Sequence, residues 1–340
     1  MSRISSISEF LLQAGTRYMI FDMSRRITRW EDQSFLDFEH GLVAHPSPRQ
    51  QQGWFAIVFA NPQLNAQHYI WFVRLPLDEQ GKLVLAARDQ FLQLIVERLA
   101  STMDDDSADK SLPDNPYQFT PGQQQLADFN SISRKALHLP PSTHFQAVND
   151  TFEQRNWQQW EQLALQGISD WVVFTEPAKR DALLGEVLTQ LPDTLQAHIL
   201  QSLENQVIGE PLSSSVANWI RLQQEPRKIA TGLRALCGVS DTPAVEALLD
   251  ELLHAPQGKE VDVLVVIAGR LWPALTDKAT LSQYLANVAH ASSDFELFRG
   301  LFSDLVQIPQ LRDQILQVLR DPHKDEILNA AIGAVFSVRH

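Results

Sequence analysis

Residues 229–237 read IATGLRALC, residues 263–271 read VLVVIAGRL, and residues 327–335 read ILNAAIGAV. The three segments are apolar, rich in small residues, and each carries a glycine inside a helical pattern. Because such a glycine costs about 1 kcal/mol relative to alanine, its presence indicates close packing against a neighbouring helix. The segments therefore predict helices that stack tightly on one another.

Helix-start residues recur at a regular spacing in the same half of the chain. Pro177, Pro211, Pro243 and Pro309 precede helical runs, and Asp277 stands where a further proline would fall. These five positions are 34, 32, 34 and 32 residues apart. A period of about 33 residues is typical of an α-solenoid, in which helical hairpins stack into a superhelix.

The beginning of the chain has a different pattern. Strand-length aromatic and branched runs, separated by short connections, predict a mostly antiparallel sheet flanked by amphipathic helices. The predicted fold class is α+β, with this small sheet domain followed by an all-α superhelical repeat domain that resembles HEAT-like solenoids. The predicted domains are an α+β sheet domain at 1–100, an acidic linker and docking arm at 101–122, and the α-helical repeat domain at 123–340.

Charge is distributed unevenly along the 340 residues. The net charge is −13, and residues 121–340 carry 17 Lys and Arg against 26 Asp and Glu. An acidic surface repels phosphate backbones, so we expect no binding to nucleic acid. The charge either keeps the protein soluble or steers a basic partner, and composition leaves both interpretations open.

The single cysteine, Cys237, excludes an intramolecular disulfide and favours a reducing compartment. Its apolar surroundings favour a buried packing residue over a reactive thiol. The longest aliphatic run, Val263–Ala268, is far shorter than the about 20 residues that a membrane helix needs. We therefore expect a cytoplasmic protein that does not contact membranes.

Motifs that carry catalysis are missing from the sequence. It contains no phosphate-binding glycine loop, no nucleophile elbow and no H-E-x-x-H zinc motif. The closest histidine pairs, His40 with His45 and His138 with His144, are not spaced to share a helix face. We expect no metal, no cofactor and no catalytic residue, which favours a non-catalytic protein and leaves the question of an enzyme open.

One charged cluster is a candidate binding site. Asp22, Arg25 and Arg26 fall between two strand patterns, Arg74 lies in a strong one, and Asp78 lies at the turn that follows. These residues form either a salt-bridge network at a turn or a site in which arginines recognise a carboxylate or phosphate.

The densest aromatic cluster of the chain lies in the same predicted domain. Its simplest interpretation is the core of a small sheet, because aromatic side chains dominate core burial. Adjacent aromatics must also lie on opposite faces of a strand, so the alternative is an apolar face that binds a partner. The cluster consists of Trp54, Phe55, Phe59, Tyr69, Trp71 and Phe72.

Three segments together carry a family resemblance: Tyr18–Arg26, Trp71–Gly81 and Pro116–Pro121. They resemble an uncharacterised gammaproteobacterial family catalogued as a domain of unknown function, and the resemblance spans nearly the whole chain. It implies a bacterial cytosolic protein and supplies no catalytic residues to carry over.

The sequence thus favours a non-catalytic interaction, scaffold or adaptor protein whose acidic α-solenoid surface binds a protein partner, and the charge is compatible with a basic one. The alternative is a small-ligand-binding or enzymatic α+β module that recognises an anionic group through Arg25, Arg26 and Arg74. Self-association into a homo-oligomer is a third possibility. The apolar segment Ala331–His340 lacks the polar face that usually ends a stack, which indicates that something covers it.

Overall fold

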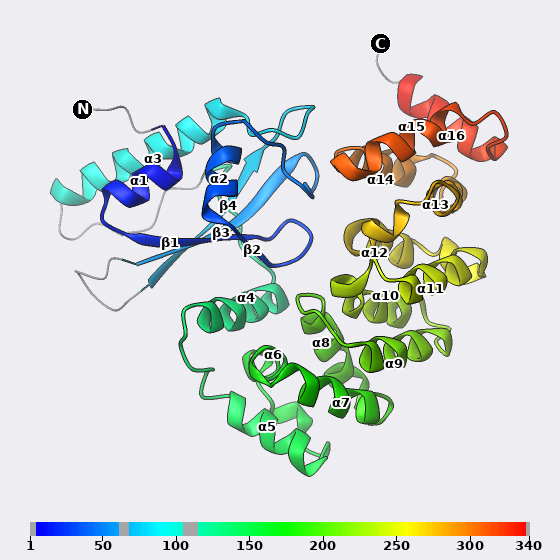
Figure 1. The fold of residues 1–340 in the computed structure, drawn as a ribbon, viewed down its shortest axis with the longest axis horizontal. Helices are drawn as coiled ribbons and strands as arrows, with labels where there is room; N and C mark the ends of the chain where they lie inside the picture. Colours follow the sequence, from blue (N-terminus) through cyan, green and yellow to red (C-terminus); the bar gives the residue numbers. More distant parts are fainter. Residues whose placement is uncertain (1–4, 61–67, 105–114, 338–340) are drawn as a thin grey trace. The chain divides into compact units, whose positions relative to one another are not determined.

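The computed structural model describes residues 5–60, 68–104 and 115–337. The chain forms two compact units, one of Met1–Pro121 with Gln307–Pro309 and the other of Gly122–Val306 with Gln310–His340. The first unit combines helices with a sheet, and the described part of the second contains helices without strands (Figure 1). The predicted α+β class, with a small antiparallel sheet ahead of a helical region, is confirmed. Residues 105–114 of the predicted linker lie outside the described residues.

The sheet of the first unit has four strands in the order β2-β1-β3-β4, and every neighbouring pair is antiparallel. In its register Ile20 lies opposite Ile57, which lies opposite Trp71 on the next strand. Side chains alternate between the two faces of a strand, so neighbouring aromatics separate onto opposite faces. The strands are β1 (Arg17–Asp22), β2 (Thr28–Trp30), β3 (Gln52–Ala60) and β4 (His68–Pro76).

One face of the sheet forms the core together with three helices: α1 (Ile7–Gln13), α2 (Asp32–Glu39) and α3 (Leu85–Asp104). Phe55 of β3 is fully buried there, and its ring lies 5.4 Å from that of Phe35 on α2. The aromatic cluster is therefore core on this face, as its simplest interpretation predicts.

The segment around Tyr117, which follows residues 105–114 in the chain, lies along the edge of β4. Arg74 N–H donates to the carbonyl of Tyr117 at 2.7 Å, and Phe119 N–H donates to that of Phe72 at 3.3 Å. Tyr117 lies in the core, where its hydroxyl donates to Gln90 of α3 at 2.7 Å. The Phe119 ring packs 5.7 Å from the Phe72 ring. The arm thus holds the edge strand through both its backbone and its aromatic side chains.

Helices of 9 to 14 residues follow one another through the second unit. Short 3-10 segments join several of them, at Trp160–Gln162, Leu188–Gln190, Cys237–Val239, Pro256–Lys259, Trp272–Leu275 and Pro309–Leu311. The helices are α4 (Gln123–Ala136), α5 (Phe145–Gln154), α6 (Leu165–Phe174), α7 (Pro177–Val187), α8 (Asp193–Leu203), α9 (Glu210–Arg221), α10 (Pro226–Ala235), α11 (Pro243–His254), α12 (Val261–Arg270), α13 (Lys278–Ala291), α14 (Glu296–Leu305), α15 (Arg312–Arg320) and α16 (Glu326–Ser337).

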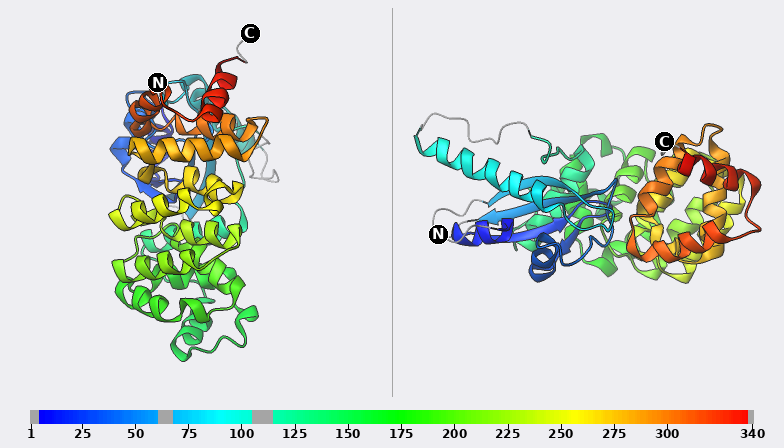
Figure 2. Two further views of the ribbon diagram at one scale, coloured as in Figure 1. Left: turned by 90° about the vertical axis from the view of Figure 1, so that its right-hand side faces the viewer. Right: turned by 90° about the horizontal axis from the view of Figure 1, so that it is seen from above.

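These helices contact one another in two series. In one series, α4, α6, α8, α10 and α12 each contact the next member, and in the other α7, α9, α11, α13 and α15 do the same. Contacts of α9 with α10 and of α12 with α13 join the two series. Figure 2 shows the helices of this unit following one another in chain order, from green to red.

The periodic residues of the sequence mark the helices of the second series. Pro177, Pro211 and Pro243 occupy the first turns of α7, α9 and α11. Asp277 is the N-cap of α13 and accepts a backbone hydrogen bond with its side chain, and Pro309 opens the 3-10 turn before α15. Proline fits a first turn because the N–H that it lacks would have no helical partner there. Aspartate fits because its carboxylate satisfies such an N–H.

Candidate functional site

Two of the predicted site residues lie at the end of β1 and are buried. The Asp22 carboxylate accepts the backbone N–H of Ser24 at 2.8 Å and lies 3.6 Å from Nε2 of His45. Arg25 donates from Nε to the carbonyl of Pro48 at 2.9 Å. These bonds fix the turn after β1 against the loop that precedes β3.

His45 completes this buried cluster. Its Nδ1 accepts the backbone N–H of Ser47 at 3.1 Å, so the ring proton of the neutral form lies on Nε2, facing Asp22 and Ser24. Burial lowers the pKa of His45, although the Asp22 charge opposes this effect. The ring also packs against Phe38 and is fully buried, which suits a structural role.

The other three predicted residues lie elsewhere in the unit. The Arg74 guanidinium stacks 5.6 Å from the Trp54 ring, and its Nε donates to the Pro116 carbonyl at 3.0 Å. The exposed Asp78 accepts two backbone N–H groups of its own turn. Arg26 Nε is buried and lacks a hydrogen-bond partner among the described residues. Asp22, Arg25 and Arg74 thus have local partners that organise the first unit.

A buried polar network that the sequence did not predict joins α4, α6 and α8. The carboxylate of Asp128 accepts the hydroxyls of Ser169 at 2.7 Å and Ser202 at 2.6 Å. It also accepts the side-chain amides of Gln124 at 3.0 Å and Asn205 at 3.3 Å. These five residues form what we call the Asp128 network. Burial raises the pKa of Asp128 to about 6, although the hydrogen bonds from Ser202, Ser169 and Gln124 lower it.

Charged side chains continue this network along the same series of helices. Glu204 lies at the end of α8, and its carboxylate accepts two hydrogen bonds from arginines. One comes from Nη1 of Arg234 on α10 at 2.7 Å, and the other from Nε of Arg270 on α12 at 2.6 Å. The Glu204 charge also raises the pKa of Asp128. One line of polar contacts therefore connects α4 to α12. Its signal in the sequence is the recurrence of polar residues at helical spacing, such as Gln124 and Asp128.

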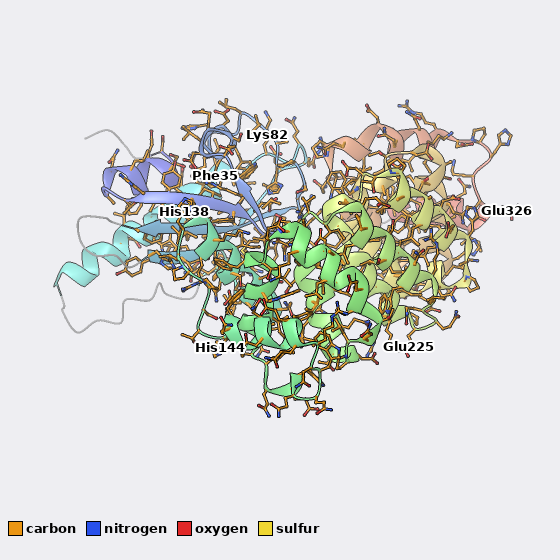
Figure 3. The ribbon with its side chains drawn as sticks, turned by 60° about the horizontal axis from the view of Figure 1, so that its bottom comes forward. Phe35, Lys82, His138, His144, Glu225 and Glu326 are labelled. Atoms are coloured by element: carbon orange, nitrogen blue, oxygen red, sulfur yellow. The ribbon has the colours of Figure 1, made fainter. Side chains whose placement is uncertain are left out.

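A surface depression of about 400 Å³ lies at the N-terminal ends of α10 and α12. Glu225, labelled in Figure 3, is the N-cap of α10, and Glu260 is the N-cap of α12. Neither side chain makes a capping hydrogen bond. The depression is lined by Glu225, Pro226, Arg227, Glu260, Val261 and Asp262. The depression therefore presents the exposed side chains of Glu225, Glu260 and Asp262 to solvent.

Metal-ligating side chains do not gather in the described residues: no three of His, Cys, Asp and Glu lie where they could hold a metal ion. His138 and His144, both labelled in Figure 3, lie in the connection between α4 and α5.

Among the helices described, none is long and apolar enough to cross a membrane. Cys237 is buried, and its thiol donates to the carbonyl of Arg270 at 3.2 Å, as a packing residue would.

Comparison with known families gives one match. The family model described as "Protein of unknown function (DUF3549)" matches residues 2–336. The resemblance to a domain of unknown function over nearly the whole chain is thereby confirmed. Searches of the curated proteins and of the solved structures found no match.

Proposed function

The chain belongs to the DUF3549 family, and we propose that it is a non-catalytic interaction protein that binds a protein partner through a HEAT-like α-solenoid. The proposal rests on the contact pattern of the second unit, in which each helix of a series contacts the next member of that series, two helices further along the chain. Repeated contact of this kind builds an extended surface, which solenoid proteins use for binding.

The construction of the helices supports a repeat architecture. Gly232 of α10 lies where an added Cβ would come within 2.5 Å of the Ile220 side chain on α9. Gly238 and Gly258 lie even closer to the backbone of their neighbours. Glycine is needed at these positions because the helices and turns approach too closely for any side chain. Of the three helical glycines from which the sequence predicts close packing, Gly232 has such a neighbour, whereas a Cβ added at Gly269 or Gly333 would meet no atom within 4 Å.

Charge supports a basic partner. Residues 121–340 carry 26 acidic against 17 basic side chains, and complementary potentials speed the encounter of two proteins. Two of the three arginines that the alternative function would use, Arg25 and Arg74, donate to the carbonyls of Pro48 and Pro116, while the third, Arg26, has a buried Nε without a hydrogen-bond partner among the described residues. These bonds favour a structural role for both, so we prefer the interaction protein to a ligand-binding α+β module. The single cysteine supports a cytoplasmic, reducing location.

The proposal is tested by affinity capture with the full-length chain as bait in an extract of its source cells. An unrelated protein of similar net charge serves as the control bait. We expect at least one protein to be enriched over the control and to be released by high salt, since exposed charges are screened. If every protein captured binds the control bait equally, the chain is not an interaction protein. Light scattering of the purified chain separates self-association from binding to another protein.

A further inference from the structure

Helix α12 leaves an apolar stripe exposed. Val261 and Val265 lie one turn apart on the same helix face and are 48% and 43% exposed. Gly269 continues the stripe, and a Cβ added there would meet no atom within 4 Å. Valine is among the residues most often buried. Two exposed valines one turn apart on the same helix face therefore form an apolar surface that a partner could cover.

Carboxylates flank one end of this stripe. Glu225, Glu260 and Asp262 surround the depression at the N-terminal ends of α10 and α12. Arg227 is the one cation in the lining, and it lies 3.7 Å from Asp262. Both side chains of this pair are exposed, at 92% and 54%, so the attraction between them is weak. The depression therefore keeps a net negative charge.

The side chains of Glu225 and Glu260 do not cap the helices that they precede. Glu176 and Asp277 hold the equivalent N-cap positions of α7 and α13, and both cap the helix through the side chain. Glu225 and Glu260 make no such bond. Their oxygens are therefore available to a cation from outside the chain.

We infer that the surface formed by Glu225, Glu260, Val261, Asp262 and Val265, the α10–α12 surface, docks a basic amphipathic segment of a partner protein. Apolar side chains of that segment cover Val261 and Val265, while a lysine or arginine enters the depression. Charge complementarity selects this occupant, because an apolar stripe bordered by carboxylates matches a helix with apolar and basic faces. The inference rests on the proposed function and adds to it the face and the chemistry of the partner.

The probe is a fluorescein-labelled synthetic peptide of about 14 residues, in which leucines recur at spacings of three and four residues and lysines fill the other positions, to give an amphipathic helix. Its binding to the full chain is measured by fluorescence anisotropy at about 0.1 M salt, where the Debye length is about 10 Å. One variant combines Glu225→Gln, Glu260→Gln and Asp262→Asn, and a second carries Val265→Ser. The matched control neutralises three exposed carboxylates on other helices or turns, with Asp241→Asn, Glu246→Gln and Asp313→Asn.

We expect the triple variant at the surface to bind about tenfold more weakly, because the cation that enters the depression loses the attraction of all three carboxylates around it. Val265→Ser should weaken binding several-fold through lost apolar contact, and the control should bind as the natural chain does. The inference is overturned if the peptide fails to bind, if the control loses as much affinity as the triple variant, or if Val265→Ser changes nothing.

A photo-crosslinking amino acid placed at Val265, or at the exposed Ala247 of α11 as a control, separates this inference from the proposed function. A partner that crosslinks from Val265 through a lysine- or arginine-rich segment supports the α10–α12 surface. A captured partner that crosslinks from Ala247 alone, from neither position, or through an acidic segment overturns the surface and leaves the proposed function standing. Failure to capture any partner with the full-length bait overturns both.

Discussion

Replacing Asp128 with asparagine should flatten the dependence of stability on pH. In the folded chain, burial raises the pKa of Asp128 from its ordinary value of 3.8 to about 6. The unfolded chain therefore releases this proton at a lower pH than the folded chain does. The favourable contribution of the protonated carboxyl is complete below pH 3.8 and is lost as the pH rises through about 6.

The size of this effect follows from the two pKa values. A difference of one pKa unit corresponds to about 1.4 kcal/mol, so the full loss is about 3 kcal/mol. Part of it falls below the range of a convenient experiment. Between about pH 5 and about pH 8, the free energy of unfolding should fall by about 1.4 kcal/mol through Asp128 alone. Asparagine removes this term because it does not titrate.

Urea unfolding, followed by the circular dichroism of the helices at both pH values, measures the effect. Other carboxylates and histidines titrate in the same range, so the quantity of interest is the change between the two pH values in the natural chain minus that in Asp128→Asn. The exposed Asp241→Asn variant is the control and should behave as the natural chain does. If Asp128→Asn shows the same dependence on pH as the natural chain, the Asp128 network does not contain a buried charge of the kind described.

Two further predictions concern close packing and buried charge, and urea unfolding tests both. Gly238→Ala should destabilise the chain by about 2–3 kcal/mol, because the new Cβ would lie 1.9 Å from the carbonyl oxygen of Gln206. Gly269→Ala is its control and should stabilise the chain by about 0.5–1 kcal/mol, since the site is open and helical. Equal changes in the free energy of unfolding for the two variants would contradict the packing argument. Arg180→Met should cost about 3–5 kcal/mol, because it leaves the buried Asp181 without its 2.8 Å partner, and a loss below about 1 kcal/mol would show that the pair is dispensable.

The helix starts were predictable because they depend on local chemistry. Proline and a capping aspartate act on the first turn of their own helix, so Pro177, Pro211, Pro243 and Asp277 mark α7, α9, α11 and α13 directly. The alternation of faces in β3 was predictable for the same reason, because adjacent residues of a strand always point to opposite sides. Both rules need no knowledge of distant contacts.

The Asp128 network was not predictable from such rules. Asp128, Ser169 and Ser202 are separated by 41 and 33 residues, and each by itself looks like an ordinary polar residue on an amphipathic helix. Only the packing of α4, α6 and α8 against one another brings the three side chains together and excludes water. The surroundings of two candidate arginines also depend on the fold. Arg25 and Arg74 look available in the sequence, but their partners are backbone carbonyls, whose positions depend on the fold.

The fold determines which of the many acidic side chains are paired with a cation and which are not. Several cations of the second unit are paired with carboxylates of a neighbouring helix about one repeat away, as in Arg221 with Glu251 and Lys228 with Asp193. Such exposed pairs add little stability, but they cancel charge locally. Carboxylates that escape this pairing then determine where the surface attracts a cation. Glu225 and Glu260 are such residues, because they do not cap their helices and because Lys228, the cation whose charge acts on Glu225, is bonded to Asp193. This distribution supports our proposal that the excess of negative charge steers a basic partner.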